Sequence, residues 1–106
     1  PRLPVVPGVR SQGDGVLMRY AARADRNQQE IINALRKAGA TVRSIHRLGQ
    51  GLPDLLVGKS GKNYLIEIKT EDGELTPDEI EFMDNWDGQA AIVRTATDAL
   101  RVIGVI

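Results

Sequence analysis

The sequence predicts a single α/β domain in which a four-stranded mixed sheet is flanked by helices. The first observation is the order of the hydrophobic patterns, which reads helix, three strands, helix and strand. The second is the length of 106 residues, which suits one hydrophobic core and leaves no room for a second. The third is the composition, because 42% hydrophobic and 26% charged residues without cysteine are typical of a globular chain that folds without disulfides.

The first third of the chain predicts an arm followed by a helix. Residues 1–15 are rich in proline and glycine, which favours an arm or an extended strand. Residues 16–24 fit either a short helix or the lead into the next one. Asn27 is a good N-cap with Glu30 three residues on, so a helix is expected to start there and to end at Gly39. Its apolar stripe consists of Ile31, Ala34, Leu35 and Ala38.

Three strands are expected next. Residues 41–46 alternate and contain β-branched side chains, and residues 54–57 form a second apolar run after a loop with glycine and proline. Residues 59–62 supply turn chemistry, so residues 64–69 are expected to pair with the second strand as a hairpin. The apolar centre of this third strand predicts a buried place in the middle of the sheet.

The last third predicts a helix, a strand and a final short helix. Thr76 and Glu79 form a capping box with proline at the first helical position. Ile80 and Met83 are expected on the inner face of that helix, with Trp86 as a further candidate for the same stripe in the core or an interface. The fourth strand and the final helix are predicted at residues 90–94 and 97–103.

The formal net charge of +0 hides a strong asymmetry along the chain. Residues 1–66 carry eleven basic against four acidic side chains, a net charge of +7. Residues 67–87 carry nine acidic side chains against Lys69 alone, a net charge of −8. A basic surface suited to phosphates and an acidic surface are therefore expected to coexist.

Charged residues around the second and third strands form the candidate site. Because side chains alternate along a strand, Glu67 and Lys69 point to one face, and the hairpin can bring Asp54 beside Glu67. The two carboxylates and the Ile68 carbonyl are hard oxygen ligands of the kind that Mg²⁺ or Mn²⁺ takes. Lys69 could orient a water nucleophile or neutralise charge in a transition state. With no cysteine and one histidine, His46, carboxylates must carry any metal.

Each of these residues also has a purely structural explanation. Glu67 and Lys69 fit a solvated pair on a strand, and Asp54 after a proline fits turn chemistry. A charged face on a strand this rich in Leu and Ile is costly unless it serves a site, which favours the functional interpretation. Glu30 is explained by its capping role, yet it can also lean over the sheet toward the same acids.

Two segments, Gly51-Leu52-Pro53-Asp54 and Leu65-Ile66-Glu67-Ile68-Lys69, resemble the PD-(D/E)xK nuclease motif. The predicted element order from residue 27 to about residue 94 is also similar to the αβββαβ core of that superfamily, which is restriction-endonuclease-like. Within the superfamily, the helix glutamate, the GxPD loop and Leu75-Thr76-Pro77 are most similar to small VRR-NUC and phage-encoded nucleases related to Holliday junction resolvases.

The resemblance implies a role for each matching residue. Asp54, Glu67 and the Ile68 carbonyl would bind the divalent metal, Mg²⁺ or Mn²⁺. Lys69 would position the attacking water. Glu30 would be a further partner of the metal site, directly or through water.

Two positions near the motif are less closely tied to the family pattern. Gln50 is a candidate for supporting the metal ligands from outside. Related sequences often carry glutamine at or near the start of the helix after Glu-x-Lys, whereas Asp78 and Glu79 stand here, so the role of that glutamine is unfilled. His46 could contact a phosphate or be an ordinary surface residue.

The function predicted from the resemblance is a metal-dependent endonuclease that hydrolyses DNA phosphodiester bonds, with Holliday junctions or other branched DNA as possible substrates. The alternative is a non-catalytic DNA-binding or assembly module, and a third interpretation is an interaction domain without nucleic acid. The candidate contacts to the DNA backbone are Arg19, Arg23, Arg26, Arg43, Arg47, Lys59 and Lys62.

The domain division and the partners follow from these interpretations. Residues 1–24 are expected to be an N-terminal arm or dimerisation segment, and residues 25–106 the nuclease domain. A homodimer is expected, because cutting two strands symmetrically needs two active sites related by a two-fold axis. No apolar run is long enough to cross a membrane, and the expected location is the cytoplasm of a bacterium or of a phage-infected host cell.

Overall fold

The computed structural model describes residues 10–106, with side chains described from residue 21 onward, and contains one four-stranded sheet. The strands are β1 (Thr41–Ser44), β2 (Leu55–Lys59), β3 (Lys62–Ile68) and β4 (Ala90–Val93), in that spatial order. β1, β2 and β3 pair antiparallel, whereas β4 pairs parallel with β3. The predicted four-stranded mixed sheet is confirmed.

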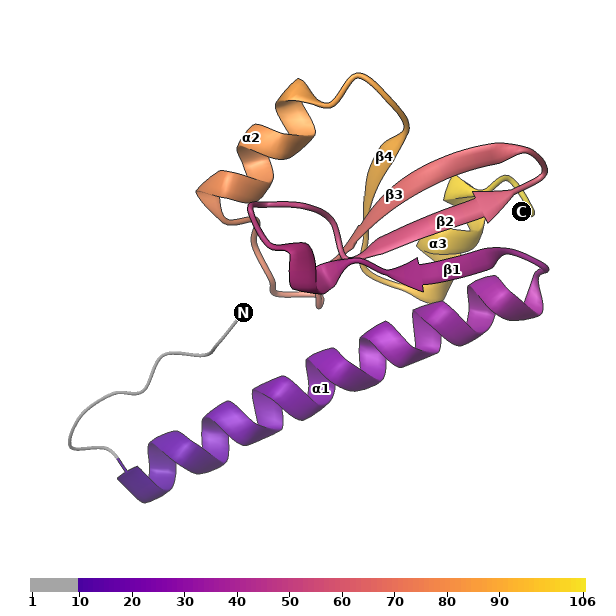
Figure 1. The fold of residues 1–106 in the computed structure, drawn as a ribbon. Coiled ribbons are helices and arrows are strands. Elements are labelled where there is room, and N and C mark those ends of the chain that lie inside the picture. Colours follow the sequence, from indigo (N-terminus) through magenta and orange to yellow (C-terminus); the bar gives the residue numbers. More distant parts are fainter. Residues whose placement is uncertain (1–9) are drawn as a thin grey trace.

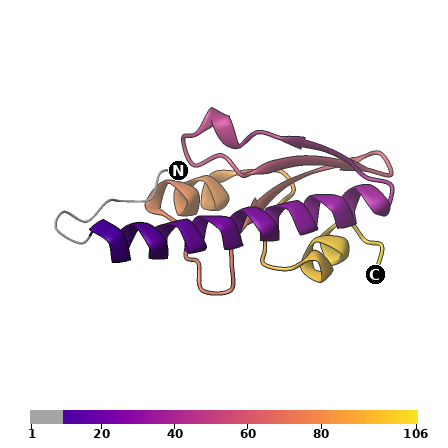
Figure 2. The same cartoon turned by 90° about the horizontal axis from the view of Figure 1, so that it is seen from below.

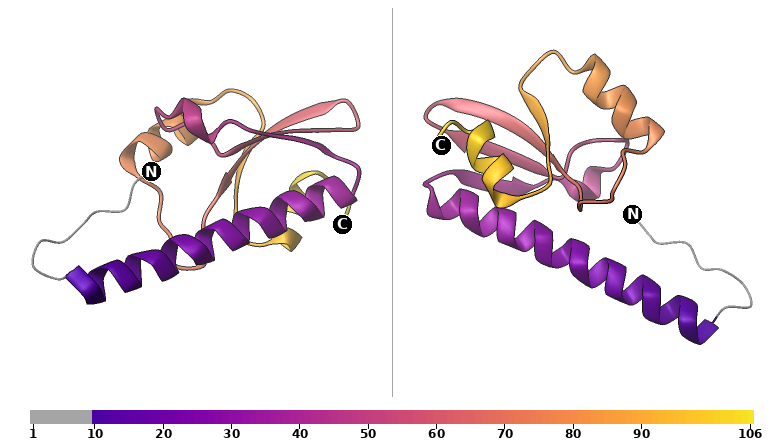
Figure 3. Two further views of the ribbon diagram at one scale, coloured as in Figure 1. Left: turned by 60° about the horizontal axis from the view of Figure 1, so that its bottom comes forward. Right: turned by 180° about the vertical axis from the view of Figure 1, so that it is seen from behind.

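Three helices accompany the sheet: α1 (Arg10–Lys37), α2 (Pro77–Asn85) and α3 (Ala96–Val102). α1 and α3 cover one face of the sheet, as Figures 1 and 2 show. α2 lies at one end of the sheet, beside the short 3-10 helix η1 (His46–Leu48) (Figure 3). No helix in the described part of the chain is long and apolar enough to cross a membrane.

The hydrophobic core lies between the sheet and the pair α1 and α3. Side chains from alternate strand positions point into it, and α1 contributes Ile31 and Leu35, both fully buried. The sheet contributes Val42, Leu55, Val57, Ile66 and Val93. The opposite face of the sheet carries Glu67 and the half-exposed Leu56 and Ile92, so the candidate acid lies on the face that α1 and α3 leave open.

The start of α1 differs from the sequence-based expectation. The expected helix start at Asn27 and its capping box with Glu30 are wrong, because α1 begins at Arg10 and passes through both residues. The expected extended strand is wrong for residues 10–15, which are helical, while the assignment of this segment as an arm stays a prediction and residues 1–9 lie outside the described residues. The cap signal was local, whereas the alanine-rich run before it is a good helix former, so the helix continues upstream.

α1 runs without a break across the expected domain boundary between residues 24 and 25. The assignment of residues 1–24 to dimerisation stays a prediction. The other end of α1 is as expected, since Gly39 follows with a positive φ of 94°, and its N–H donates to the Arg36 carbonyl at 3.0 Å.

The remaining elements agree closely with the sequence. The β2–β3 hairpin turns at Ser60 and Gly61, both with positive φ. Thr76 and Glu79 form the predicted capping box. Some details differ: β1 ends at Ser44 rather than at residue 46, and α3 begins at Ala96 with Thr95 as its cap rather than at residue 97. Ile80 of α2 and Trp86 at its C-terminal end are 46% and 47% exposed instead of facing inward.

Candidate active site

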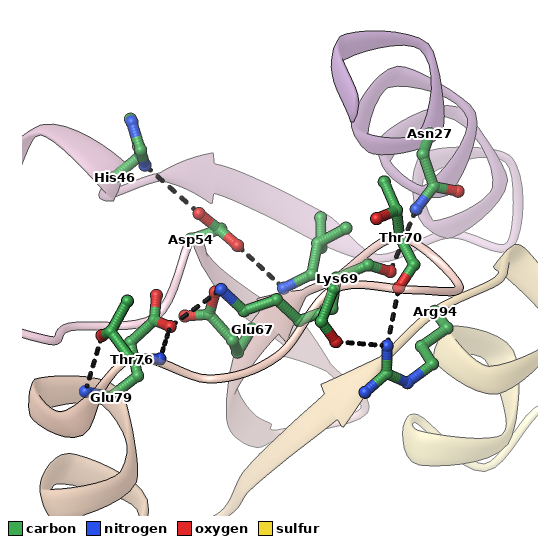
Figure 4. Close-up of polar contacts among 11 residues, drawn as sticks. Asn27, His46, Asp54, Glu67, Lys69, Thr70, Thr76, Glu79 and Arg94 are labelled. Carbon is green, nitrogen blue, oxygen red and sulfur yellow. Dashed lines mark hydrogen bonds and ion pairs between the residues drawn. The ribbon is translucent and has the colours of Figure 1, made fainter. Parts of the chain in front are cut away.

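The β2–β3 hairpin places Asp54 across from Glu67. Leu55 pairs with Ile66 in the register of the two strands, and one step further along both strands the opposed residues are Asp54 and Glu67. Both are buried, at 9% and 3% relative exposure. Two carboxyl groups are therefore held side by side away from bulk water, as the sequence predicted, and Figure 4 shows them between η1 and α2.

The orientation of the Asp54 carboxylate is fixed by two hydrogen bonds. Its Oδ2 accepts from the backbone N–H of Ile68 at 2.7 Å, which links the start of β2 to the end of β3. Its Oδ1 lies 3.2 Å from Nδ1 of His46, the first residue of η1. His46 is partly exposed, so it contacts the Asp54 carboxylate from the solvent side. It therefore belongs to the site, although the sequence did not predict it as a metal ligand.

Lys69 lies just beyond β3 and is bound by two acids. Its Nζ is 2.8 Å from Oε1 of Glu79 and 3.7 Å from Oε2 of Glu67. The same Oε1 of Glu79 accepts from the backbone N–H of Thr76 at 2.8 Å. Glu79 thus uses one oxygen both to cap α2 and to hold Lys69 (Figure 4).

Glu79 is the site residue that sequence reasoning missed. Its capping role explained it fully, so no second role was sought. The signal that could have found it is its place in the first turn of the helix that follows Glu-x-Lys, a region that the resemblance to the nuclease motif had already singled out. In this chain a glutamate occupies that region and faces Lys69.

The ionisable side chains of Glu67, Lys69 and Glu79 influence one another's pKa. Burial raises the pKa of Glu67 to about 9, and the nearby Asp54 and Glu79 add to the shift while Lys69 opposes it. Burial by itself would lower the pKa of Lys69, but the bond to Glu79 and the surrounding acids outweigh it and raise that pKa. Burial by itself would raise the pKa of Glu79, but the bonds that Glu79 accepts from Lys69 and from the Thr76 N–H outweigh it and lower that pKa. Glu67 is therefore neutral near pH 7 in the metal-free protein, and Lys69 is charged.

The backbone around Lys69 is held from three sides. Its N–H donates to the Val93 carbonyl of β4 at 3.0 Å, and its carbonyl accepts from Nδ2 of Asn27 at 3.3 Å. Nη1 of Arg94 donates to the carbonyls of Thr70 at 2.6 Å, Gly73 at 2.8 Å and Glu71 at 3.3 Å. These bonds fix the loop between β3 and α2, which sets the position of Glu79 relative to Lys69.

The carboxyl pair fits a divalent cation. Within residues 21–106, no three histidine, aspartate or glutamate side chains converge closely enough to form a complete protein cage for a metal. Mg²⁺ does not require one, since it is commonly bound by one or two carboxylates with waters and substrate phosphates. Burial and the charge of Asp54 keep Glu67 protonated. A cation bound between the two carboxyls would offset their mutual repulsion and favour the ionised form of Glu67. Asp54 and Glu67 would hold it.

The other predicted site residues lie in different places. Glu30 is exposed on α1, and none of the contacts that join Asp54, Glu67, Lys69 and Glu79 includes it. Ile68 gives its N–H to Asp54, while the role of its carbonyl as a metal ligand stays a prediction. Gln50 is exposed in the loop before Asp54, with a left-handed φ of 59°.

The predicted DNA contacts are spread over the molecule. Arg43 of β1 pairs with Leu56 and shares the open sheet face, and Arg47 lies in η1 next to His46. Lys59 and Lys62 flank the hairpin turn, roughly 20 Å from the end of β3 at the usual rise per strand residue. Arg23 and Arg26 are exposed on α1, and the side chain of Arg19 lies outside the described ones.

Comparison with solved structures identifies the fold. A structure described as a VRR_NUC domain superposes with a TM-score of 0.64 over 76% of this chain and 92% of that chain, at 21% sequence identity. No protein-family model matches the sequence, and no curated protein matches it. The chain therefore has the fold of a VRR-NUC domain, and at this identity the similarity speaks for the fold alone.

Proposed function

We propose that this VRR-NUC-like domain is a divalent-metal-dependent endonuclease that hydrolyses DNA phosphodiester bonds. The observation that carries the proposal is the buried pair of Asp54 and Glu67 next to Lys69, in a fold shared with a VRR_NUC domain. Burying two ionisable carboxyl groups side by side is costly to a fold, which supports a functional role over a structural one.

Asp54 and Glu67 would hold Mg²⁺ or Mn²⁺, with the Ile68 carbonyl and Glu30 as further proposed partners. A bound ion of this type polarises a phosphoryl oxygen and makes a coordinated water more acidic. His46 and the Ile68 N–H fix the orientation of the Asp54 carboxylate, which would be one of the ligands of the ion.

Lys69 acts on the reacting groups. Its ammonium orients the attacking water and stabilises the negative charge that develops on the phosphoryl oxygens. As the water oxygen bonds to phosphorus, the water gives up one proton to solvent and one P–O ester bond breaks. The departing oxygen takes up a proton from solvent and leaves as a hydroxyl. Glu79 keeps Lys69 charged and in place, which makes Glu79 a positioning residue.

The DNA backbone would be bound by basic side chains around this site. Arg43 and Arg47 are the nearest candidates along the open face and η1, and Arg23 and Arg26 extend the surface along α1. Symmetric cleavage of branched DNA would need two such sites, so we also propose a two-fold homodimer.

One observation favours the alternative, a non-catalytic DNA-binding or assembly module. Lys69 is closer to Glu79 than to Glu67, at 2.8 Å against 3.7 Å, so part of its charge is already neutralised. A module of this kind would bind DNA without cutting it.

Plasmid nicking distinguishes the two functions. The wild-type protein should convert supercoiled plasmid to nicked circles with Mg²⁺ or Mn²⁺ and not with EDTA. Asp54→Asn, Glu67→Gln and Lys69→Ala should each reduce the rate at least about 100-fold while DNA binding and circular dichroism stay unchanged. Full activity of Asp54→Asn, purified free of host nuclease, contradicts the proposed site.

A panel of linear, flap, fork and four-way junction DNA then defines the substrate, and sedimentation on junction DNA tests the dimer.

A further inference from the structure

A pocket of about 310 Å³ lies between α2 and the loop that precedes Asp54. Its lining consists of Gln50, Asp78, Glu81, Phe82, Asn85 and Trp86. The volume is within the range of small-molecule binding sites. Apart from Gln50, which the sequence offered as a support for the metal ligands, the proposed chemistry uses none of these side chains, so the pocket needs its own explanation.

The wall of the pocket on α2 is aromatic. The rings of Phe82 and Trp86 stack with centroids 5.1 Å apart and an interplanar angle of 17°. Trp86 is nevertheless 47% exposed, and α2 has no fully buried residue. The indole stacks on Phe82, and Gly88 lies against its Nε1, since a Cβ at Gly88 would come within 2.7 Å of that nitrogen. The exposed remainder of the ring offers a flat apolar surface to a planar ligand.

The pocket is rigidly connected to the candidate active site. Glu79, which binds Lys69, belongs to the first turn of the same helix. The loop lies directly against that helix, since a Cβ at Gly51 would collide with the backbone carbonyl of Asp78. Trp86 follows Glu79 by seven residues, roughly 10 Å along the helix axis. A ligand on Trp86 is thus within about three nucleotide steps of a phosphate at Lys69.

The rim of the pocket discriminates between ligands. Asp78 and Glu81 bring negative charge, which repels a phosphate group. Carboxylates accept hydrogen bonds from the exocyclic amino groups of bases, and the amides of Gln50 and Asn85 both donate and accept. An uncharged, planar group with amino and carbonyl edges matches this set.

We propose that the pocket binds one unstacked nucleobase of the DNA strand that is cut, stacked on Trp86 and preferably carrying an amino group. The inference rests on the proposed nuclease function and makes it more specific. An enzyme with such a pocket acts preferentially where a base is already unpaired, because pulling a base out of a duplex costs a few kcal/mol of stacking and pairing energy. Branch points and single-stranded flanks meet this condition.

The chain has a single tryptophan, Trp86, so its fluorescence reports on this pocket alone. The experiment uses end-labelled single-stranded oligonucleotides of adenine, cytosine or thymine and a matched abasic strand, in EDTA so that nothing is cleaved. We expect adenine and cytosine strands to quench Trp86 strongly, thymine less and the abasic strand least. Trp86→Leu should weaken binding, measured by anisotropy of the label, at least about fivefold, and Trp86→Phe should restore most of it.

Ile80 provides the matched control. It lies on the same helix with a similar exposure of 46% and does not line the pocket, so Ile80→Ala should bind as the wild type does. Unchanged Trp86 fluorescence at saturating oligonucleotide, or equal quenching by the abasic strand, overturns the proposal. A spectral shift that depends on protein concentration without DNA also overturns it, because a second copy of the chain then covers Trp86.

The two proposals fail separately in this design. Lys69→Ala should lose cleavage and keep the quenching by bases. Quenching without any cleavage by the wild type contradicts the nuclease and leaves the base pocket standing, whereas cleavage without quenching contradicts the pocket alone.

Discussion

Glu79 and Lys69 form a 2.8 Å ion pair that joins the first turn of α2 to the end of β3. The pair involves two different levels of structure. Glu79 is placed by a local capping box with Thr76, and Lys69 by the central strand of the sheet and its bonds to β4 and α1. The capping interaction that starts the helix therefore also fixes the lysine that we place at the reacting phosphate.

Replacing Glu79 tests its role as a positioning residue. Glu79→Ala removes both the cap and the partner of Lys69, and we expect kcat to fall about tenfold with KM nearly unchanged, as for lost alignment without lost binding. Glu79→Gln keeps an amide oxygen for Thr76 and Lys69, so most of kcat should return. A Glu79→Ala enzyme with wild-type kcat, or a loss that Glu79→Gln does not rescue, contradicts the positioning role.

Glu67 makes the metal-free protein less stable as the pH rises. Burial raises the pKa of Glu67 to about 9, well above its value in an unfolded chain, so the folded state holds a proton that the unfolded state has lost. This contribution is fully present below about pH 4.5 and is lost as the pH rises toward 9. Thermal unfolding in EDTA should accordingly show the Tm falling across this window.

Glu67→Gln is the matched variant for that measurement, since the amide has the same shape and cannot ionise. At pH 8 in EDTA we expect its Tm to exceed that of the wild type by several degrees, where each kcal/mol corresponds to about 4–8 °C in a domain of this size. Saturating Mg²⁺ should stabilise the wild type and leave Glu67→Gln nearly unaffected. Identical pH profiles for the two metal-free proteins would refute the buried, protonated state of Glu67.

The basic residues differ in their distance from the site, which separates backbone contacts from solvating charges. Arg43→Ala combined with Arg47→Ala should weaken DNA binding and lower the magnitude of the slope of log K against log salt by about one to two. The reason is that a protein with fewer phosphate contacts releases fewer counterions when it binds. Lys59→Ala combined with Lys62→Ala, at the hairpin turn, removes the same charge and should change neither quantity. Equal losses in both double variants would mean that only total charge matters.

The parts of the fold that were predictable from the sequence depend on local patterns. The apolar run in residues 64–68 and the turn at Ser60 and Gly61 specify the hairpin, and the register of that hairpin brings Asp54 to Glu67. The Thr76 and Glu79 box likewise marks the start of α2. In each case the determining residues are close together along the chain or opposed across one turn.

The parts that were not predictable depend on contacts between distant segments. Asn27 has the features of a helix start, yet it lies within α1 and its side chain reaches Lys69 instead. The contact of Glu79 with Lys69 depends on the path of the loop between them, which Arg94 of the region after β4 fixes. No periodicity or spacing in the sequence encodes such a path.

Arg94 is accordingly expected to control the site from outside it. One nitrogen of its guanidinium, Nη1, holds the carbonyls of Thr70, Glu71 and Gly73. Because the three carbonyls share that single nitrogen, we count them as about one hydrogen bond to a charged group, which contributes about 1.5–3 kcal/mol. Arg94→Ala should therefore lower the free energy of unfolding by about 2 kcal/mol and reduce cleavage at least tenfold even below the unfolding transition, because the loop no longer holds Glu79 against Lys69. Urea denaturation and nicking assays measure the two effects.

Thr70→Val is the control in the same loop: the Thr70 hydroxyl is buried without a hydrogen-bond partner among the described residues, so its removal should leave both stability and cleavage near wild type. An Arg94→Ala protein that is destabilised yet cuts at the wild-type rate would show that the loop supports the fold and not the geometry of the site.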